Sequence, residues 1–483
     1  MKKSRLQVNL MLQSFYQVLI VITPLITSPY ISRVLGADGL GIYSYSYSLS
    51  NYFAILAMLG TITYGSKVIA KTRDDKYERS KIFFEIITLQ ILLASIGTII
   101  YVAFIVASGQ ENREIFLIQA MMIVACAFNV GWFFFGMEEF RITVTRNVII
   151  KVIQIACIFL FVKTKSDLWK YVFIMAFGEL LSQLSLFFII RKYICFVNPT
   201  LKGILRHIKP NLLLFIPGIA FAVNQDLDKT MIGIFSSYAN TGFYYNAEKL
   251  IKIPTGIITG VGVVLLPYVT NSIAVNKGKN TSSFIKKAIY PMMFLTVALS
   301  VGIISISREF VPIFFGEGYD PCIDLIKIMA FTMIFKAIAD AIRTQYLIPN
   351  DREKDYSTAV LVGAIVNCIL NLIMIRNHGA MGAAIATLIS EALVFVIYNV
   401  IIWRDTQLLI DLMKCCIFAV PAVFMYITVR SVSKLFQTGI SQLIIEIIVG
   451  GIVYIVVGVC FLFIINKKET LAMIRAALKR HKK

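Results

Sequence analysis

Charged residues are scarce in this sequence, and long polar stretches are missing. Only 15% of the 483 residues are charged against 58% that are hydrophobic, and the mean hydropathy is +0.78. Polar intervals stay below about 20 residues, whereas a soluble domain needs at least about 50. A separate soluble domain is therefore excluded. Apolar runs of about 20 residues recur from end to end instead, which is typical of an all-α polytopic membrane protein.

Histidine is nearly absent, and the cysteines show none of the spacings of a metal site. The three histidines, His207, His378 and His481, are far apart in the sequence, and the eight cysteines lie mostly inside apolar runs. A metal centre needs several such ligands close together. The sequence also has no GxxxxGK[ST] loop for nucleotide phosphates and no other catalytic signature. We therefore expect no cofactor, no ATP-driven step in this chain and no enzymatic activity.

Acidic residues are few relative to basic ones. The chain has 47 Lys and Arg against 27 Asp and Glu, a formal net charge of +20. The densest basic clusters fall on the same side of the predicted membrane topology; they are Lys67–Lys81, Arg191–Lys209, Lys277–Lys287 and Lys467–Lys483. Positive residues favour the cytoplasmic side, so both termini are predicted to be cytoplasmic. Topology and contact with anionic lipid headgroups explain the charge without nucleic acid as a partner.

The apolar runs predict about fourteen transmembrane helices. The run that follows Met1–Arg5 is too long for a signal peptide and is expected to remain as the first span. The predicted spans are residues 10–32, 41–65, 83–107, 115–136, 148–163, 168–190, 211–235, 241–268, 288–307, 324–347, 359–376, 379–402, 412–430 and 440–465.

Short matches indicate that the chain repeats itself. Gly41-Ile42-Tyr43 opens the second predicted span and Gly242-Phe243-Tyr244 opens the eighth, and Asn9 and Asn211 open the first and seventh. Six spans per repeat give two halves of the same orientation, related by an axis along the membrane normal. We expect two six-helix lobes, at residues 1–210 and 211–402, with a cavity between them. Two additional transmembrane helices at 403–466 and a basic cytoplasmic tail at 467–483 complete the chain.

The stretch 211–235 is long and apolar enough to cross a bilayer, yet it carries Asp226, Asp228 and Lys229. An ionisable side chain at membrane depth costs about 2.5–3.5 kcal/mol on insertion scales and normally faces protein or a water-filled cavity. Asp226 and Lys229 are three residues apart and share a helix face. They form either an ion pair that helps two helices pack or part of a cavity wall.

Further buried charges follow in the second half of the chain, and most of them are cationic. Glu248 and Lys252 are four residues apart with Lys249 beside them, and Lys336, Asp340 and Arg343 share another helix face. A cavity lined by such cations would attract an anion, most plausibly a phosphate or diphosphate headgroup. The carboxylates Asp226, Asp228, Glu248 and Asp340 either hold these cations in place or take up a coupling proton or sodium ion.

The segment Ile22–Asp75 resembles the opening of the Wzx-type polysaccharide and O-antigen flippases, in the superfamily that includes MATE exporters and lipid II flippases. The resemblance rests on a proline-containing first helix, the turn Arg33-Val34-Leu35-Gly36 and the run Gly65–Asp75. The segment Phe310–Tyr319 is also similar to an outer loop of that family. At the level of topology the likeness covers essentially the whole chain, and it implies a MATE-like arrangement of the two lobes.

The resemblance implies a carrier in the bacterial cytoplasmic (inner) membrane. Members move oligosaccharide units linked to undecaprenyl diphosphate from the cytoplasmic to the outer leaflet by alternating access of two lobes. Expected partners are this lipid-linked oligosaccharide, membrane lipids, a proton or sodium ion for coupling, and the polysaccharide polymerase machinery. Arg33 matches an arginine at the outer end of the family's first helix, so it joins the residues expected to handle the anion.

Other functions remain open at this stage. A MATE-like drug or metabolite antiporter would share the repeat but should have an excess of acidic residues in its cavity, and here the excess is basic. A lipid II flippase would share the fold and the mechanism. A membrane-embedded glycosyltransferase or polymerase would need an acidic or metal-binding constellation on a substantial outer loop, which the sequence does not contain.

Overall fold

The computed structural model describes residues 2–275, 281–406, 408–436 and 439–465, and these residues are almost wholly helical. In this described part, nine helical stretches are long and apolar enough to cross a membrane. The chain is therefore an all-α polytopic membrane protein, as the sequence predicts. The predicted basic tail at 467–483 lies outside the described residues.

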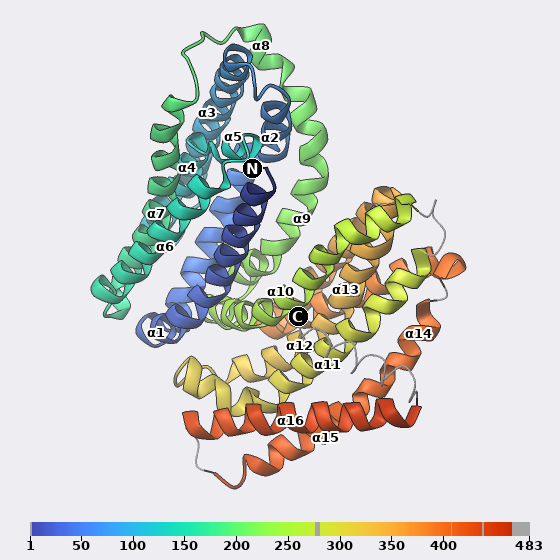
Figure 1. The fold of residues 1–483 in the computed structure, drawn as a ribbon. Helices are drawn as coiled ribbons and strands as arrows, with labels where there is room; N and C mark the ends of the chain where they lie inside the picture. Colours follow the sequence, from blue (N-terminus) through green and yellow to red (C-terminus); the bar gives the residue numbers. More distant parts are fainter. Residues whose placement is uncertain (1, 276–280, 407, 437–438, 466–483) are drawn as a thin grey trace. The chain divides into compact units, whose positions relative to one another are not determined.

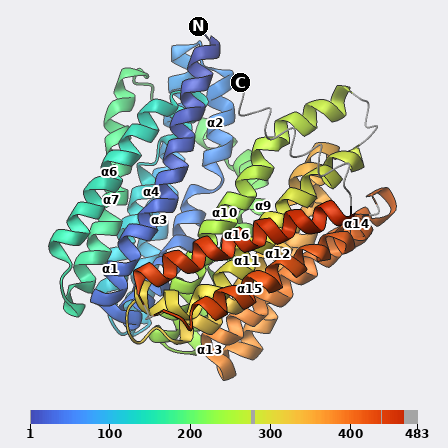
Figure 2. The ribbon, with the colours of Figure 1, turned by 60° about the horizontal axis from the view of Figure 1, so that its bottom comes forward.

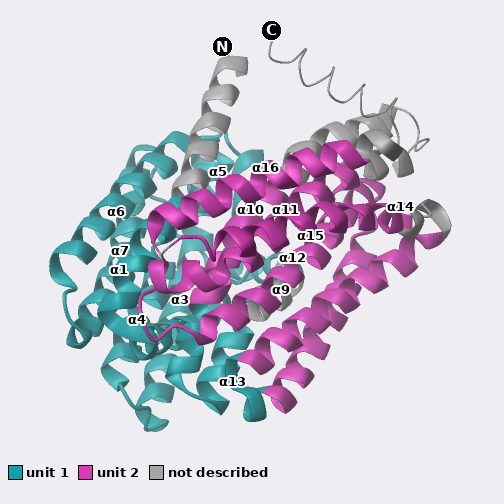
Figure 3. Ribbon diagram, turned by 90° about the horizontal axis from the view of Figure 1, so that it is seen from below, with its two compact units in different colours: residues 1–245, 375–380 teal, residues 246–374, 381–483 magenta. Residues whose placement is uncertain are grey.

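The chain divides into two compact units, which Figure 3 colours separately. Unit 1 comprises Met1–Tyr245 and Ile375–Ala380. Within it, α4 lies against α1, α3 and α7, and α6 packs on α7 (Figure 1). Its helices are α1 (Lys2–Met58), α2 (Thr61–Lys71), α3 (Lys76–Ala107), α4 (Arg113–Ala127), α5 (Gly131–Gly136), α6 (Phe140–Phe161), α7 (Leu168–Ile189), α8 (Leu201–Arg206), α9 (Ile208–Phe235) and the start of α10 (Tyr238–Val275).

Unit 2 comprises Asn246–Met374 and Met381–Lys483. Besides the rest of α10 it contains α11 (Thr281–Phe314), α12 (Pro321–Ile342), α13 (Glu353–Thr406), α14 (Leu408–Cys415), α15 (Ala419–Val432) and α16 (Ile440–Ile465). The C-terminal helices α15 and α16 lie against α11, as Figure 2 shows. One guanidinium nitrogen of Arg430 on α15 contacts both carboxylate oxygens of Glu309 on α11, at 2.8 and 2.9 Å. This charged contact helps to hold α15 against α11.

Most predicted spans lie on one helix each, and two pairs of spans join into kinked helices. The span predicted at 412–430 runs from α14 through the short 3-10 segment Cys416–Phe418 into α15. Within α1 the chain breaks at Gly36, where φ is 71° and ψ is 177°, and within α13 it breaks at Gly379, where φ is 53° and ψ is −132°. Residues with a Cβ rarely adopt a positive φ, so glycine permits both turns. These kinks separate the first predicted span from the second and the eleventh from the twelfth.

Two predicted spans extend beyond the end of their main helix into a second, short helix. The second predicted span runs to residue 65, but α1 ends at Met58, and the chain turns through Leu59 (φ 41°) and Gly60 (φ 77°) into α2. The fourth runs to residue 136, but α4 ends at Ala127 and the short α5 follows. Both breaks lie inside apolar runs, so hydropathy alone does not reveal them.

Gly41 on α1 and Gly242 on α10 form a reciprocal backbone contact. A Cβ on Gly41 would lie 1.7 Å from the carbonyl oxygen of Tyr238, and a Cβ on Gly242 would lie 1.9 Å from that of Ala37. Tyr238 is four residues before Gly242, and Ala37 is four residues before Gly41. Each glycine therefore meets the carbonyl four residues before the other glycine, and both pairs are about 201 residues apart in the sequence. The two glycines that mark the repeat in the sequence therefore occupy equivalent places in the structure. Their missing side chains allow the backbones to touch.

The connection from α7 to α9 is anchored by a buried charged cluster. Glu85 on α3 is 1% exposed, and its Oε2 atom contacts Arg206 of α8 at 2.5 Å and Nε2 of His207 at 2.9 Å. The Nδ1 atom of His207 lies 2.8 Å from the Tyr64 hydroxyl. A neutral His207 satisfies both contacts, because its Nε2–H donates a hydrogen bond to Glu85 while Nδ1 accepts one from the Tyr64 hydroxyl. Arg206 then balances the charge of Glu85.

Burial lowers the pKa of His207 below its ordinary value of 6.5, although the neighbouring Glu85 partly opposes this effect. The unfolded chain then binds the proton at a higher pH than the folded chain does. The contribution of His207 to the free energy of unfolding should be fully present above pH 6.5. It should be lost as the pH falls below that value. Thermal unfolding of the detergent-solubilised protein between pH 5 and 8 measures this. In the non-titrating His207→Gln variant this part of the pH dependence should disappear; an unchanged profile would contradict the assignment.

Candidate functional site

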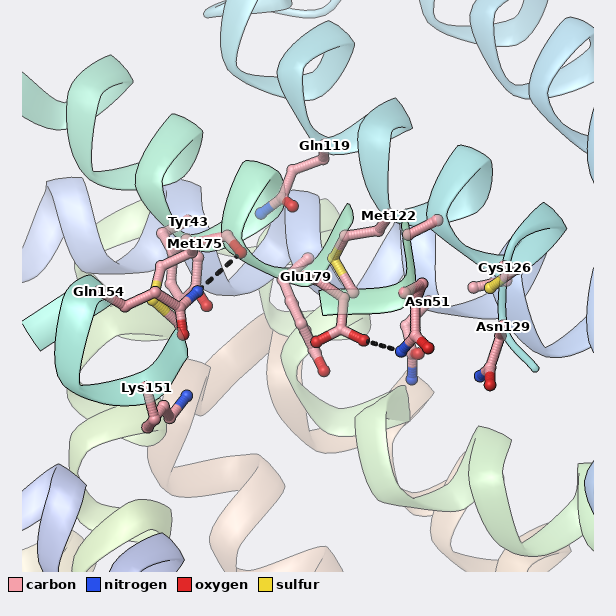
Figure 4. A pocket seen from close by; sticks show the side chains of 14 residues that line it. Tyr43, Asn51, Gln119, Met122, Cys126, Asn129, Lys151, Gln154, Met175 and Glu179 are labelled. Carbon is pink, nitrogen blue, oxygen red and sulfur yellow. Dashed lines mark hydrogen bonds between the residues drawn. The ribbon is translucent and has the colours of Figure 1, made fainter. Parts of the chain in front are cut away.

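Unit 1 contains a polar pocket of about 350 Å³ between helices α1, α4, α6 and α7 (Figure 4). Five amide side chains, one carboxylate, one ammonium group and two tyrosines supply most of its surface. Its lining residues are Tyr43, Tyr47, Asn51, Ala54, Gln119, Met122, Ala125, Cys126, Asn129, Lys151, Gln154, Met175, Glu179 and Gln183. Such a concentration of polar groups among apolar helices indicates a binding site, because polar groups in contact with lipid are costly.

Helical periodicity explains why these side chains share one space. Side chains three or four residues apart lie on the same helix face. On α1 the pocket residues are Tyr43, Tyr47 and Asn51, and on α7 they include Glu179 and Gln183. The lining residues of α4 and α6 follow the same three- and four-residue spacing. Each helix therefore presents a polar stripe inward, while its other faces remain apolar.

Some of the polar groups in the pocket are held in place by neighbours. The Gln154 amide donates to the backbone carbonyls of Ile174 and Met175, at 3.3 and 3.2 Å. The Gln183 amide donates to the Glu179 carboxylate at 2.6 Å. Glu179 is itself exposed to the pocket, and its charge interacts with that of Lys151. The pocket thus offers a fixed carboxylate and an ammonium group to a ligand.

Gln119 is different, because its amide has no partner. Its side chain is 1% exposed and lines the pocket, and within the described residues neither its nitrogen nor its oxygen has a hydrogen-bond partner. A buried amide without partners costs free energy, so such groups usually bind water or a ligand. Gln119 can donate to one hydroxyl group and accept from another at the same time. Together with the tyrosine rings, this arrangement suits the hydroxyl groups and ring faces of a sugar.

The pocket adjoins the charged residues predicted on α9. Asn51, which lines the pocket, donates to Asp226 Oδ2 at 2.8 Å, and Asp226 Oδ1 lies 2.6 Å from Lys229 Nζ. The next residue on α1, Tyr52, contacts the Thr230 hydroxyl at 3.0 Å. The predicted ion pair exists, and it connects α9 to the helix that forms one wall of the pocket.

The other predicted residues of unit 1 lie apart from this pocket. Asp228 is buried and accepts a hydrogen bond from the Tyr244 hydroxyl. Arg33 is exposed and donates to the Pro29 carbonyl at 3.0 Å, just before the kink at Gly36. Arg33 therefore lies on α1 before the kink at Gly36, whereas Asn51, which contacts Asp226 of α9, lies after it.

The predicted residues of unit 2 form ion pairs. Lys252 lies 2.8 Å from Glu248, and Arg343 lies 3.1 Å from Asp340. Lys336 lies 3.9 Å from Glu391, a carboxylate that the sequence reasoning did not assign to the site. Lys249 is half-buried on the helix that carries Glu248 and Lys252. Neighbouring carboxylates therefore reduce the positive charge expected from the lysines and arginine alone.

The sequence reasoning missed most of the pocket in unit 1. It did not select Gln119, Lys151 or Glu179. Lys151 and Glu179 are ionisable residues inside predicted spans, a signal that could have identified them. Among the described residues, no group of three or more His, Cys, Asp or Glu side chains could hold a metal ion.

Solved structures with the same fold define the class of protein. A lipid II flippase MurJ in its inward closed conformation has a TM-score of 0.74 at 17% identity and covers 94% of this chain and 98% of its own. An inward-facing multidrug resistance MATE transporter of the MOP superfamily has a TM-score of 0.57 at 14% identity, over 82% of this chain and 98% of its own. These likenesses show that the chain has the polytopic helical fold of the two solved structures.

The sequence comparison gives the family. The chain belongs to the polysaccharide biosynthesis protein family, whose profile matches residues 8–272. A relative from Escherichia coli (strain K12), named "Putative O-antigen transporter", is 22% identical over 375 residues, which are 77% of this chain and 90% of the relative. The "Probable low-salt glycan biosynthesis flippase Agl15" of Haloferax volcanii is 28% identical over 166 residues, 34% of this chain and 35% of that protein.

Proposed function

We propose that this chain is a flippase that moves lipid-linked oligosaccharide units across the membrane for polysaccharide biosynthesis. The observation that carries the proposal is the polar pocket of unit 1, in which amides, a carboxylate and tyrosine rings face one space inside apolar helices. Membership of the polysaccharide biosynthesis protein family and the O-antigen transporter among its relatives support it. The pocket would bind sugar groups through hydrogen bonds that replace those the sugar makes with water.

The finer features of the transport cycle belong to the same proposal. The substrate would be linked to undecaprenyl diphosphate and would move from the cytoplasmic to the outer leaflet of the bacterial inner membrane by alternating access. Both termini would be cytoplasmic, and the lobes would divide at residues 210 and 402. A proton or sodium ion would provide coupling, and the polysaccharide polymerase would act on the product. No chemical step is needed, so the chain would not be an enzyme.

The diphosphate would be bound by the predicted cations. They are Arg33, Lys229, Lys249, Lys252, Lys336 and Arg343, and their acidic neighbours would hold them in place. Lys229 is the best supported of these, because its pair with Asp226 connects through Asn51 to the pocket.

One observation favours a second candidate, an ion-coupled antiporter for cationic compounds. Glu179 presents a carboxylate in the pocket and is exposed to it. A carboxylate there would attract a cation, as the antiporter requires. Lys151, in the same pocket, opposes this attraction. The two candidates differ in what the cell loses when the protein is absent.

A deletion experiment separates the two candidates. Cells without the gene should stop exporting surface polysaccharide and should accumulate the complete diphosphate-linked unit in the inner leaflet. Normal polysaccharide together with new sensitivity to cationic drugs would overturn the flippase and establish the antiporter. Complementation with the wild-type gene is the control, since it must restore export.

Gln119→Leu should reduce export about tenfold or more in the deletion strain, because a substrate would lose two hydrogen bonds of roughly 1 kcal/mol each. The folded protein should be as stable as the wild type or more stable, because the amide it loses has no partner. Gln90→Leu is the matched control. The Gln90 amide donates to the carbonyls of Cys126 and Asn129 and accepts from Trp132, so its loss should lower the unfolding temperature. Normal export in the Gln119→Leu strain would contradict a binding role.

A further inference from the structure

A second cavity in unit 1 lies between α6 and α7, and its lining is almost wholly apolar. It encloses about 450 Å³ along the outer faces of the two helices. Ile150 and Ile153 of α6 and Phe173, Phe177 and Leu181 of α7 are among its lining residues. We call it the α6–α7 groove. The helices of the groove are stretches that can cross a membrane, so the groove opens toward hydrocarbon.

The groove and the polar pocket share one side chain. Gln154 lines both cavities and donates to two carbonyl groups of α7. Its amide also packs on Gly178, where a Cβ would lie 2.2 Å from the amide nitrogen. The two cavities are therefore separated by a partition one side chain thick. A molecule with a polar part and a hydrocarbon part can use both cavities from adjacent positions.

The dimensions of the groove match one leaflet of a bilayer. It extends along α6 from Phe161 to Ile150 and along α7 from Trp169 to Leu181. At a rise of 1.5 Å per residue these segments are about 16–18 Å long, which is roughly half of a 30 Å hydrocarbon core. The groove begins at the turn between the two helices, which the charge distribution of the sequence places on the outer side of the membrane.

The polar end of the groove is cationic. Lys163 and Lys165 are exposed on the turn between α6 and α7, and Lys170 follows one helical turn later. Asp167 is the acidic residue among them and lies 2.6 Å from Lys170. An anionic headgroup at the membrane surface would meet these lysines while its chain descended into the groove.

The aromatic wall of the groove favours an unsaturated chain. The rings of Phe173 and Phe177 are stacked, with centroids 5.3 Å apart and an angle of 6° between their planes, and the side chains are 40% and 41% exposed. Each unit of a polyprenyl chain has a planar double bond that can lie flat on a ring face, whereas a saturated acyl chain has no planar segment. Trp169 adds a further ring near the polar end of the groove.

We infer that the α6–α7 groove binds the polyprenyl chain of the lipid-linked substrate in the outer leaflet, with its phosphates at the lysines of the turn. This inference rests on the proposed function and adds a binding site for the hydrocarbon part of the substrate. Gln154 lies near the end of the groove that is farther from the turn, so the polar pocket adjoins the hydrocarbon part of the bound chain rather than its phosphates. The groove keeps the substrate at the protein surface while its sugar part leaves or approaches the pocket.

Photolabelling of the purified full chain in phospholipid nanodiscs tests this inference. One sample contains a polyprenyl diphosphate with a photoreactive group on its chain, and a second contains phosphatidylglycerol with the same group on an acyl chain. The polyprenyl probe should label residues 150–181 in preference to other membrane surfaces. Loss of both rings in Phe173→Ala/Phe177→Ala should reduce this label about fivefold to tenfold.

The exposed pair Ile99 and Ile100 on α3 provides a matched control, because both side chains face outward at 68% and 54% exposure. Ile99→Ala/Ile100→Ala should leave labelling of the groove unchanged. If the alanine variant of the groove fails to fold, Phe173→Leu/Phe177→Leu retains the apolar volume without the flat faces and should also lose label. Equal labelling of the groove by the phosphatidylglycerol probe would show an ordinary boundary lipid and would overturn the inference.

The photolabelling test of the groove and the deletion test of the proposed function can fail independently. Polysaccharide export that depends on the gene, together with no polyprenyl label in the groove, would overturn the groove alone. Export that does not depend on the gene would overturn the proposed function, whatever the probe labels.

Discussion

Lys229→Ala should abolish transport and also lower the amount of folded protein in the membrane. The side chains of Lys229 and Asp226 are only 7% and 10% exposed, and the ammonium group lies 2.6 Å from the carboxylate. Removing the lysine leaves a buried carboxylate that accepts a hydrogen bond from the amide of Asn51. Breaking a buried pair in this way costs about 3–5 kcal/mol, a large part of the 5–15 kcal/mol that stabilises a typical protein.

A charge-neutral double variant separates folding from transport. In Asp226→Asn/Lys229→Met the new amide can still accept from Asn51, and methionine fills the space of the lysine without a charge. We expect membrane levels close to those of the wild type, because replacing a buried pair by neutral groups is often well tolerated. Transport should remain at least about tenfold low, since the phosphate contact is lost. Lys229→Arg should retain part of the activity.

Quantitative immunoblotting of membranes and export of surface polysaccharide measure the two effects. Recovery of both protein and export in the double variant would show that the ion pair serves only to pack α9 against α1. Recovery of protein without export would support a contact between Lys229 and the substrate.

Gly41→Ala should destabilise the protein by about 3 kcal/mol or more, although it adds a single methyl group. The new Cβ would lie 1.7 Å from the Tyr238 carbonyl oxygen, and a backbone atom cannot rotate out of the way as a side chain can. Helices α1 and α10 would have to move apart by more than an ångström at their closest contact. Gly242→Ala should have a similar effect, because its Cβ would lie 1.9 Å from the Ala37 oxygen.

Gly256→Ala is the control for this prediction. It lies on α10 as Gly242 does, but a Cβ there would have no atom within 4 Å. Alanine favours a helix over glycine by about 1 kcal/mol, so this variant should be at least as stable as the wild type. Thermal unfolding in detergent compares the three variants. A Gly41→Ala protein that unfolds at the wild-type temperature would show that the two helices are not in backbone contact.

The order and class of the helices could be predicted from the sequence, because apolar length alone decides where a chain can cross a bilayer. The ends of some helices could not. At Leu59-Gly60 and again after Ala127 the chain turns inside an apolar run, and the positive φ angles that define the first turn leave no mark in hydropathy. The break at Gly36 was easier to predict, because Arg33 and several glycines interrupt the apolar run there.

The candidate site was harder to predict for a different physical reason. Its pocket is assembled from four helices, and each contributes only a few polar side chains that look unremarkable within their own span. Gln119 is notable only because no group among the described residues forms a hydrogen bond with its amide. Similarly, the charge on Lys336 cannot be evaluated without Glu391, which lies 55 residues further along the chain and 3.9 Å away. Distant partners of this kind require the fold.

The reciprocal contact between Gly41 and Gly242 has the local form of a two-fold interface. In a homodimer with two-fold symmetry, residue i of one subunit contacts residue j of the other, and j contacts i in return. The α1–α10 contact has this form within one polypeptide, with each glycine against the carbonyl four residues before its counterpart. A side chain added at either glycine would therefore disturb the same close approach of the two helices.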